Sequence, residues 1–168
     1  MRHGEAAAHW TEAEDAALSA LGNQQAAAVA SLLASRNPVT LISSPLRRAR
    51  ETAAHLETLW KTAARVEAAI AEIPTQGTAH DERSVWLNGL MEGGWRGADV
   101  SSRRWRDDVL TFVTGLEGDA VIFTHFVVIN AVVGAALERD DVYVFRPANA
   151  SITTIHNDGR RLRLIEQG

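Results

Sequence analysis

The apolar residues follow two spacings along the chain, which predict two kinds of element. Short β-branched runs are typical of buried strands, and apolar residues three or four positions apart are typical of helices packed on one face. The pattern predicts helices at 19–35, 45–60, 81–91, 102–116 and 126–138, and strands at 39–44, 65–70, 119–124, 142–146, 151–157 and 160–166. Strands that alternate with helices indicate a layered α/β fold on a largely parallel sheet.

Local signals support the first two helix starts. Ser19 is a suitable cap for the first helix, and Asn37-Pro38 ends it. Ser44 is expected to cap the second helix, with Pro45 in its first position. Neither a repeat nor a Gly/Ser-rich linker interrupts the pattern, so residues 1–168 are expected to form a single domain.

Composition and charge narrow the function classes. Hydrophobic residues make up 46% of the chain and charged residues 23%, as in an ordinary globular protein, and the net charge of −4 argues against a nucleic-acid partner. The chain has no cysteine, which excludes disulfides and thiolate chemistry. The longest apolar run, residues 126–137, is too short to span a bilayer and contains Asn130, so no membrane partner is expected. With no signal peptide in the pattern, the expected location is the cytoplasm.

Basic side chains follow two of the predicted strands, where α/β proteins bind their ligands. His125 stands at the end of the strand at 119–124, and Arg47, Arg48 and Arg50 begin the helix after the strand at 39–44. On a helical wheel Arg47 lies opposite the apolar stripe and can pair with Glu51. Only Arg48 both flanks the stripe and lies close to the strand end. Arginine opposes the dipole at a helix start, which suggests a bound anion, although a solvated basic face is the simpler reading of the motif alone.

The first residues also carry chemistry, because Arg2-His3-Gly4-Glu5 directly follows the initiator methionine. Such a segment is either a surface tail or one pinned inside a site. The spacing of His3, Glu5 and His9 raises the possibility of a metal site. It lacks the HExxH arrangement that places two histidines on one helix face, so no metal is predicted.

Taken together, several motifs resemble the histidine phosphatase superfamily, which includes the cofactor-dependent phosphoglycerate mutases. The matching segments, in chain order, are RHGE (2–5), LSALGNQQAAAVA (18–30), SSPLRRARETA (43–53), FTH (123–125) and NASITTI (149–155). The resemblance spans nearly the whole chain. It implies a phosphoglycerate mutase-like, three-layer α/β/α sandwich with a mostly parallel central sheet.

The resemblance also implies roles for five residues. His3 would be the nucleophile that forms a phosphohistidine, and Arg2, Arg48 and a protonated His125 would surround the phosphoryl group. Glu72, in AIAEIP, would be the acid that protonates the leaving oxygen and later takes a proton from water. No cofactor is required for this chemistry.

Several side assignments stay open. Glu67 is the alternative acid, although it falls within the predicted strand rather than at its exit. Glu5 would either hold the RHG loop by hydrogen bonds or be a solvated carboxylate. Residues 71–97 are expected to contribute to substrate choice, and Trp86 and Trp95 in this segment fit a core role equally well.

The chain departs from the family pattern in two places. Members normally carry an apolar strand before RHG, and here Met1 alone occupies that place. Either translation starts upstream or the sheet lacks a piece, which would loosen His3. Phe126 stands where the family commonly has glycine after the second histidine, and its ring would either narrow the pocket or be accommodated by neighbours.

The sequence therefore predicts a phosphatase that hydrolyses a phosphomonoester, with a small phosphorylated molecule or a phosphohistidine protein as its partner. A mutase that returns the phosphoryl group is the enzymatic alternative, although the chain has little room for the long capping insertion of phosphoglycerate mutases. A phosphate- or phosphoprotein-binding module is the non-enzymatic alternative. The pattern indicates neither the natural substrate nor the oligomeric state.

Overall fold

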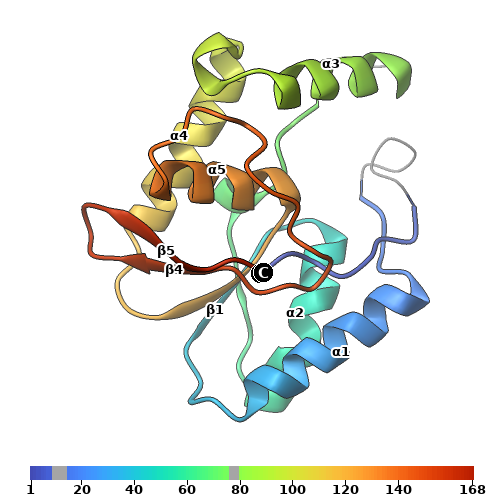
Figure 1. The fold of residues 1–168 in the computed structure, drawn as a ribbon. Helices are drawn as coiled ribbons and strands as arrows, with labels where there is room; N and C mark the ends of the chain where they lie inside the picture. Colours follow the sequence, from blue (N-terminus) through green and yellow to red (C-terminus); the bar gives the residue numbers. More distant parts are fainter. Residues whose placement is uncertain (9–14, 76–79) are drawn as a thin grey trace.

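The computed structural model describes residues 1–8, 15–75 and 80–168. Figure 1 shows the arrangement of its helices and strands. The elements are α1 (Ala20–Ala34), β1 (Thr40–Ser43), α2 (Arg47–Trp60), β2 (Arg65–Val66), η1 (Ala68–Ile70), α3 (His80–Glu92), η2 (Trp95–Gly97), α4 (Val100–Thr114), β3 (Ala120–Phe123), α5 (Phe126–Ala136), β4 (Thr154–Asn157) and β5 (Leu162–Glu166).

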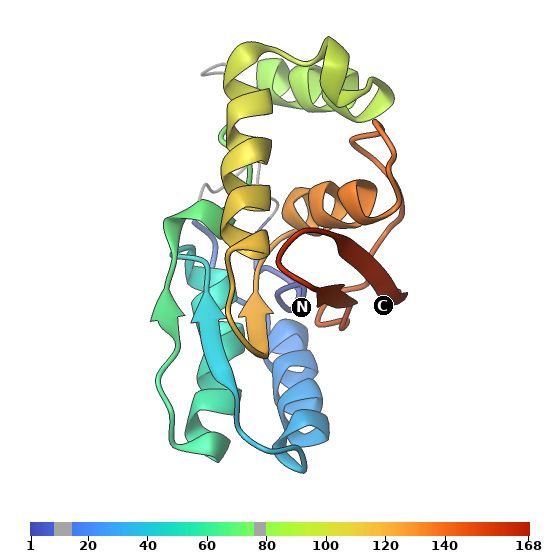
Figure 2. The ribbon, with the colours of Figure 1, turned by 90° about the vertical axis from the view of Figure 1, so that its left-hand side faces the viewer.

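A parallel sheet in the order β2-β1-β3 forms the middle layer, and its three strands point the same way (Figure 2). Successive side chains of a strand face opposite sides of a sheet. Leu41 accordingly packs against α1 and α2, and its neighbour Ile42 packs against α4 and α5. Helices thus cover both faces, and the predicted α/β/α sandwich with a parallel central sheet is confirmed. The hairpin predicted near the end of the chain is also present as antiparallel β4 and β5.

The second helix begins later than the sequence predicts. Ser44 was expected to cap a helix starting at Pro45, but α2 begins at Arg47 and Leu46 is its cap. The Ser44 hydroxyl accepts a hydrogen bond from the Leu46 amide at 3.2 Å, which closes a turn ahead of the helix. Ser44 is thereby held at the end of β1, where it is fully buried.

One predicted strand is shorter than expected, and another predicted strand does not form. The strand at 65–70 shrinks to the two residues of β2, because the Glu67 carboxylate accepts the Ala69 amide at 3.1 Å and starts the 3₁₀ turn η1. Residues 142–146 form no strand. The amides of Val144 and Phe145 donate instead to the side-chain oxygen of Asn130, at 2.8 and 2.9 Å, so they are not available to a neighbouring strand.

The first three residues lie beside β3 as a short parallel pairing. The Thr124 amide donates to the Met1 carbonyl and the His3 amide donates to the Thr124 carbonyl, both at 2.9 Å. On the other side, the Ala150 amide donates to the His3 carbonyl at 3.1 Å. Backbone bonds from two directions fix His3, so the expectation that it would be loosened is not met. In the described part of the chain, no helix combines the length and apolar character needed to cross a membrane.

Candidate active site

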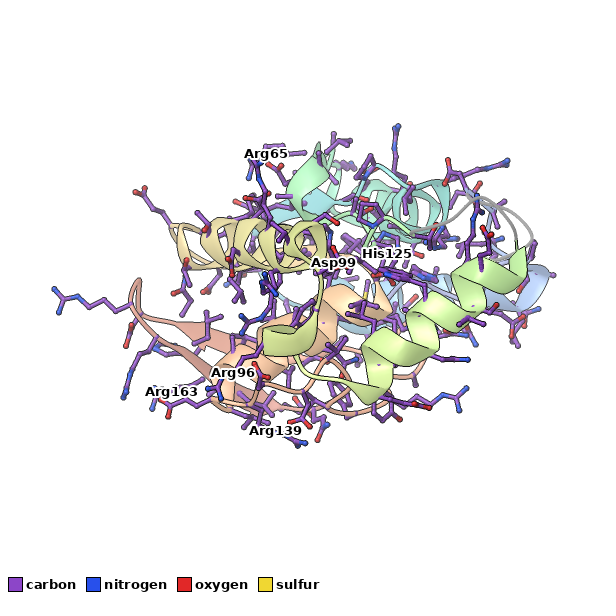
Figure 3. The ribbon with its side chains drawn as sticks, turned by 90° about the horizontal axis from the view of Figure 1, so that it is seen from above. Arg65, Arg96, Asp99, His125, Arg139 and Arg163 are labelled. Carbon is purple, nitrogen blue, oxygen red and sulfur yellow. The ribbon has the colours of Figure 1, made fainter. Side chains whose placement is uncertain are left out.

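The carboxyl ends of β1 and β3 and the N-terminal segment meet at one edge of the sheet, where parallel strands place their ligand sites. His3, Arg48 and His125 lie there, and all three are buried. The imidazole rings of His3 and His125 are 5.1 Å apart between centroids. Three motifs that are distant in sequence therefore meet in one place. Viewed from above, His125 lies near the middle of the molecule, while Arg65, Arg139 and Arg163 lie at its outer edge (Figure 3).

Two contacts decide which nitrogen of His3 carries the proton. Nδ1 lies 2.6 Å from the Gly4 carbonyl, which only accepts hydrogen bonds, so Nδ1 is the N–H donor. Nε2 lies 3.2 Å from Nε of Arg48, which only donates, so Nε2 presents its lone pair. Both neighbours select the same neutral tautomer. His3 therefore directs an unprotonated, nucleophilic nitrogen toward a guanidinium group.

The surroundings of His3 also keep the ring neutral. Burial is the largest cause that lowers its pKa, and the positive charges of Arg48 and Arg2 lower it further. The Gly4 carbonyl acts in the opposite direction, but the net result is a pKa of about 3. At neutral pH the lone pair on Nε2 is therefore free of a proton.

The side chain of Arg48 is buried and that of Arg47 faces solvent, as the helical wheel predicted. Arg48 is 5% exposed and its guanidinium reaches His3. Arg47 is exposed and pairs with Glu51 four residues on, at 2.7 Å. The buried guanidinium lies at the end of β1, so its charge is directed into the site.

His125 caps the start of α5 and is fully buried. Its Nε2 lies 2.6 Å from the Ser44 hydroxyl, and its Nδ1 makes no hydrogen bond within the described part of the chain. Burial first, and then His3, Arg48 and Arg2, lower the pKa of His125 well below its usual value. A protonated His125 was expected, but these surroundings favour the neutral ring. The Ser44 hydroxyl accepts the Leu46 amide, and when it donates in turn to Nε2 of a neutral His125, the ring proton lies on Nδ1.

Glu72, not Glu67, reaches the site. The two carboxylate oxygens of Glu72 accept the amides of Ile73 at 3.1 Å and Val127 at 3.3 Å, and Val127 belongs to the first turn of α5. Burial raises the pKa of Glu72, although both amides and the charges of Arg48 and Arg2 act to lower it. Glu67 is used to cap η1 and pairs with Arg65.

Close backbone contact holds the RHG loop against α1. A Cβ atom on Gly4 would clash with the Gly22 carbonyl, and one on Gly22 would clash with the Glu5 carbonyl. Glu5 accepts a hydrogen bond from the Ser19 hydroxyl at 2.8 Å, while Ser19 caps α1 as predicted. Glu5 therefore holds the loop. Thr52, which sequence reasoning missed, accepts the Gly4 amide at 3.0 Å from one turn of α2 beyond Arg48.

Phe126, the departure from the family pattern, is accommodated by its neighbours. Its ring lies 5.4 Å from the guanidinium carbon of Arg2, a cation–π contact. It also stacks on Tyr143, with ring centroids 5.9 Å apart and a 21° angle between planes. Arg2 is held further by the Pro147 carbonyl at 2.8 Å. Sequence reasoning missed Tyr143, because it falls in a segment that was expected to be a strand.

A cavity of about 610 Å³ lies at this site. Its lining includes the polar residues Arg2, His3, Arg48 and Glu72 and the apolar residues Ile73, Leu87, Met91, Phe126 and Tyr143. Residues of the 71–97 segment thus line the cavity, and their contribution to substrate choice stays a prediction. Trp95 is 2% exposed and belongs to the core with Trp105.

Within residues 1–8, 15–75 and 80–168, no group of three or more His, Asp or Glu side chains is arranged to hold a metal ion. His9, the third member of the metal ligand set considered from the sequence, lies outside the described residues.

The fold and the paired histidines define an α/β protein with a buried site at the strand ends, where two histidines lie beside an arginine. A family model, histidine phosphatase superfamily (branch 1), matches residues 1–167, and the chain belongs to this family. A comparison with curated proteins found no significant match.

Solved structures agree with the family. A mycobacterial hydrolase is 25% identical, with a TM-score of 0.74 over 99% of this chain and 95% of that one. A mycobacterial glucosyl-3-phosphoglycerate phosphatase solved with VO3 is also 25% identical, with a TM-score of 0.72 over 98% and 94%. A phosphoserine phosphatase from Entamoeba histolytica with 3-phosphoglyceric acid shares the fold at 21% identity, with a TM-score of 0.76 over 99% and 93%.

Proposed function

We propose that this protein is a phosphatase that hydrolyses a phosphomonoester through a phosphohistidine on His3, without a cofactor. The observation that carries the proposal is the neutral His3 ring, whose Nε2 lone pair faces the Arg48 guanidinium. A group that only binds phosphate has no use for an unprotonated nitrogen at this position, whereas a nucleophile requires one.

In the first step, His3 Nε2 attacks phosphorus in line, and the bond between phosphorus and the ester oxygen breaks. The electron pair of that bond goes to the leaving oxygen, which takes its proton from the Glu72 carboxyl group. The raised pKa of Glu72 suits this role because it keeps the acid form to higher pH. The Arg48 N–H that faces Nε2 in the free chain turns to a phosphoryl oxygen.

In the second step, water attacks phosphorus and the P–N bond breaks, which returns the electron pair to Nε2. The Glu72 carboxylate takes the proton from that water. Arg2, Arg48 and the Nδ1–H of His125 stabilise the negative charge in both steps. A neutral His125 held by Ser44 can donate this hydrogen bond without being protonated.

The test is to trap the intermediate. Reaction with a ³²P-labelled phosphomonoester, quenched without acid, should leave label on the peptide that contains His3, and the bond should resist alkali and break in acid. His3→Ala should bind phosphate through Arg2 and Arg48 but form no adduct. Glu72→Gln with a nitrophenyl ester should accumulate the adduct, because that leaving group needs no proton.

Other outcomes of the same experiment identify the alternatives. Undiminished turnover in His3→Ala would overturn the mechanism. Transfer of the label to a second phosphate ester instead of water would identify a mutase. Phosphate binding without adduct or turnover across a broad panel of esters would identify a binding module.

A further inference from the structure

We infer that the alcohol part of the substrate is apolar and carries a ring, which rests on the proposed function. The inference comes from the side chains that line the cavity beyond the phosphoryl position. Its volume, about 610 Å³, is that of a site for a small organic molecule rather than for phosphate alone.

The cavity lining combines charged and apolar side chains. The charged ones include Arg48, whose guanidinium lies 3.2 Å from His3. Five large apolar side chains from four parts of the chain also line the cavity, and together they are called the apolar wall. They are Ile73 after η1, Leu87 and Met91 of α3, Phe126 of α5, and Tyr143 from the segment after α5.

The wall is a built surface rather than a loose loop. Leu90 and Val142, next to Met91 and Tyr143, are 8% and 0% exposed, so they anchor both segments in the core. The stacked rings of Phe126 and Tyr143 present an aromatic surface, of which Tyr143 is 44% exposed. An apolar ring placed against this surface would lose contact with water and gain aromatic contacts.

Polar partners for a polyhydroxylated alcohol are few in the described part of the lining. Apart from the four residues with proposed catalytic or phosphate-binding roles, the polar side chains of the lining are Glu5, Thr75, Arg146 and Asn149. Glu5 already accepts a hydrogen bond from Ser19. A hydroxyl group buried without a partner costs affinity. The wall therefore favours an aryl-alkyl alcohol over a sugar or glycerate.

The test compares phosphate esters with alkoxide leaving groups, so that the chemistry stays similar. We expect kcat/KM for 3-phenylpropyl phosphate to exceed that for n-propyl phosphate by about tenfold or more. It should also exceed kcat/KM for glycerol 1-phosphate and 3-phosphoglycerate. Equal values for the two propyl esters, or a clear preference for 3-phosphoglycerate through Arg146, would overturn the inference.

Substitutions in the apolar wall test whether its side chains cause the preference for the phenylpropyl ester. Tyr143→Ser and Met91→Gln should each lower the ratio of phenylpropyl to propyl kcat/KM by about threefold to tenfold. Val85→Gln is the matched control, because Val85 lies on the same helix as Met91, is 73% exposed and does not line the cavity. If the ratio is unchanged in both wall variants, the assignment is overturned. Tyr143→Ser is expected to fold, because Tyr143 is partly exposed to solvent.

Failure of this inference is distinguishable from failure of the proposed function. If the protein turns over 4-nitrophenyl phosphate and forms the His3 adduct, but has equal kcat/KM values for 3-phenylpropyl and n-propyl phosphate, only the inference of an apolar substrate is refuted. A protein that turns over none of these esters and forms no adduct refutes the phosphatase.

Discussion

Replacing one of two adjacent arginines by alanine should abolish anion binding, and replacing the other should not. Arg48→Ala removes a guanidinium that is 5% exposed and lies 3.2 Å from His3. Arg47→Ala removes one whose side chain is 61% exposed and pairs only with Glu51 among the described contacts. The two changes delete the same charge one residue apart, so each is the control for the other.

The expected magnitudes follow from the two environments. A hydrogen bond to a charged group is worth about 1.5–3 kcal/mol, and the guanidinium fork of Arg48 can make two to one phosphoryl group. Their loss amounts to about 3–6 kcal/mol, or roughly 10²- to 10⁴-fold in affinity. An exposed i,i+4 ion pair such as that of Arg47 contributes only about 0.3–0.5 kcal/mol. The Arg47 amide, which donates to Asp15 at 2.6 Å, is unaffected by the substitution.

Isothermal titration calorimetry with orthovanadate or tungstate measures both variants directly, and thermal melts report whether each is folded. If Arg48→Ala does not fold, Arg48→Lys keeps the charge but loses the bidentate geometry and should still bind substantially more weakly than the parent. Equal losses from Arg47→Ala and Arg48→Ala would show that this face of α2 was misread. Unchanged affinity in a folded Arg48→Ala would refute the anion site itself.

Two further predictions concern Glu72 and the loop contact. Since burial raises the pKa of Glu72, kcat/KM for an alkyl ester should be level at lower pH and fall as pH rises through that raised pKa. Initial-rate assays should show a weaker fall with 4-nitrophenyl phosphate, whose leaving group needs no proton. An identical fall for both esters would contradict the acid role of Glu72. Gly22→Ala should lower the free energy of unfolding by about 1–3 kcal/mol in urea titrations, because the added carbon meets the Glu5 carbonyl, whereas Gly97→Ala, with open space around it, should cost less.

Much of the site could be predicted because each signal was local. Arg48 was distinguished from Arg47 by helix geometry and by its distance from a strand end. The position of His125 at the end of a strand followed from the apolar run at 119–124, and Ser19 was recognisable as a cap. These features depend on residues only a few positions apart, which is the range over which sequence patterns are informative.

What the sequence could not provide depends on partners far along the chain. The amides of Val144 and Phe145 look available for a strand until the Asn130 side chain takes both. The pattern of residues 65–70 continues past Val66, but the Glu67 side chain ends the strand by capping a turn. Phe126 could not be placed because the Arg2 guanidinium beside it comes from the opposite end of the chain.

The backbone bonds that fix His3 also set the order in which this site is made. The Arg2 amide donates to the Ser151 carbonyl and the Ala150 amide donates to the His3 carbonyl, so His3 is secured by residues that are translated long after it. At about 5–20 residues per second, His3 is translated roughly 7–30 s before those partners are. For most of that interval the N-terminal segment has neither β3 nor the Ala150 region to pair with. The bonds that secure His3 therefore form only after Ser151 has been translated, and a nascent chain that stops before Ser151 lacks them.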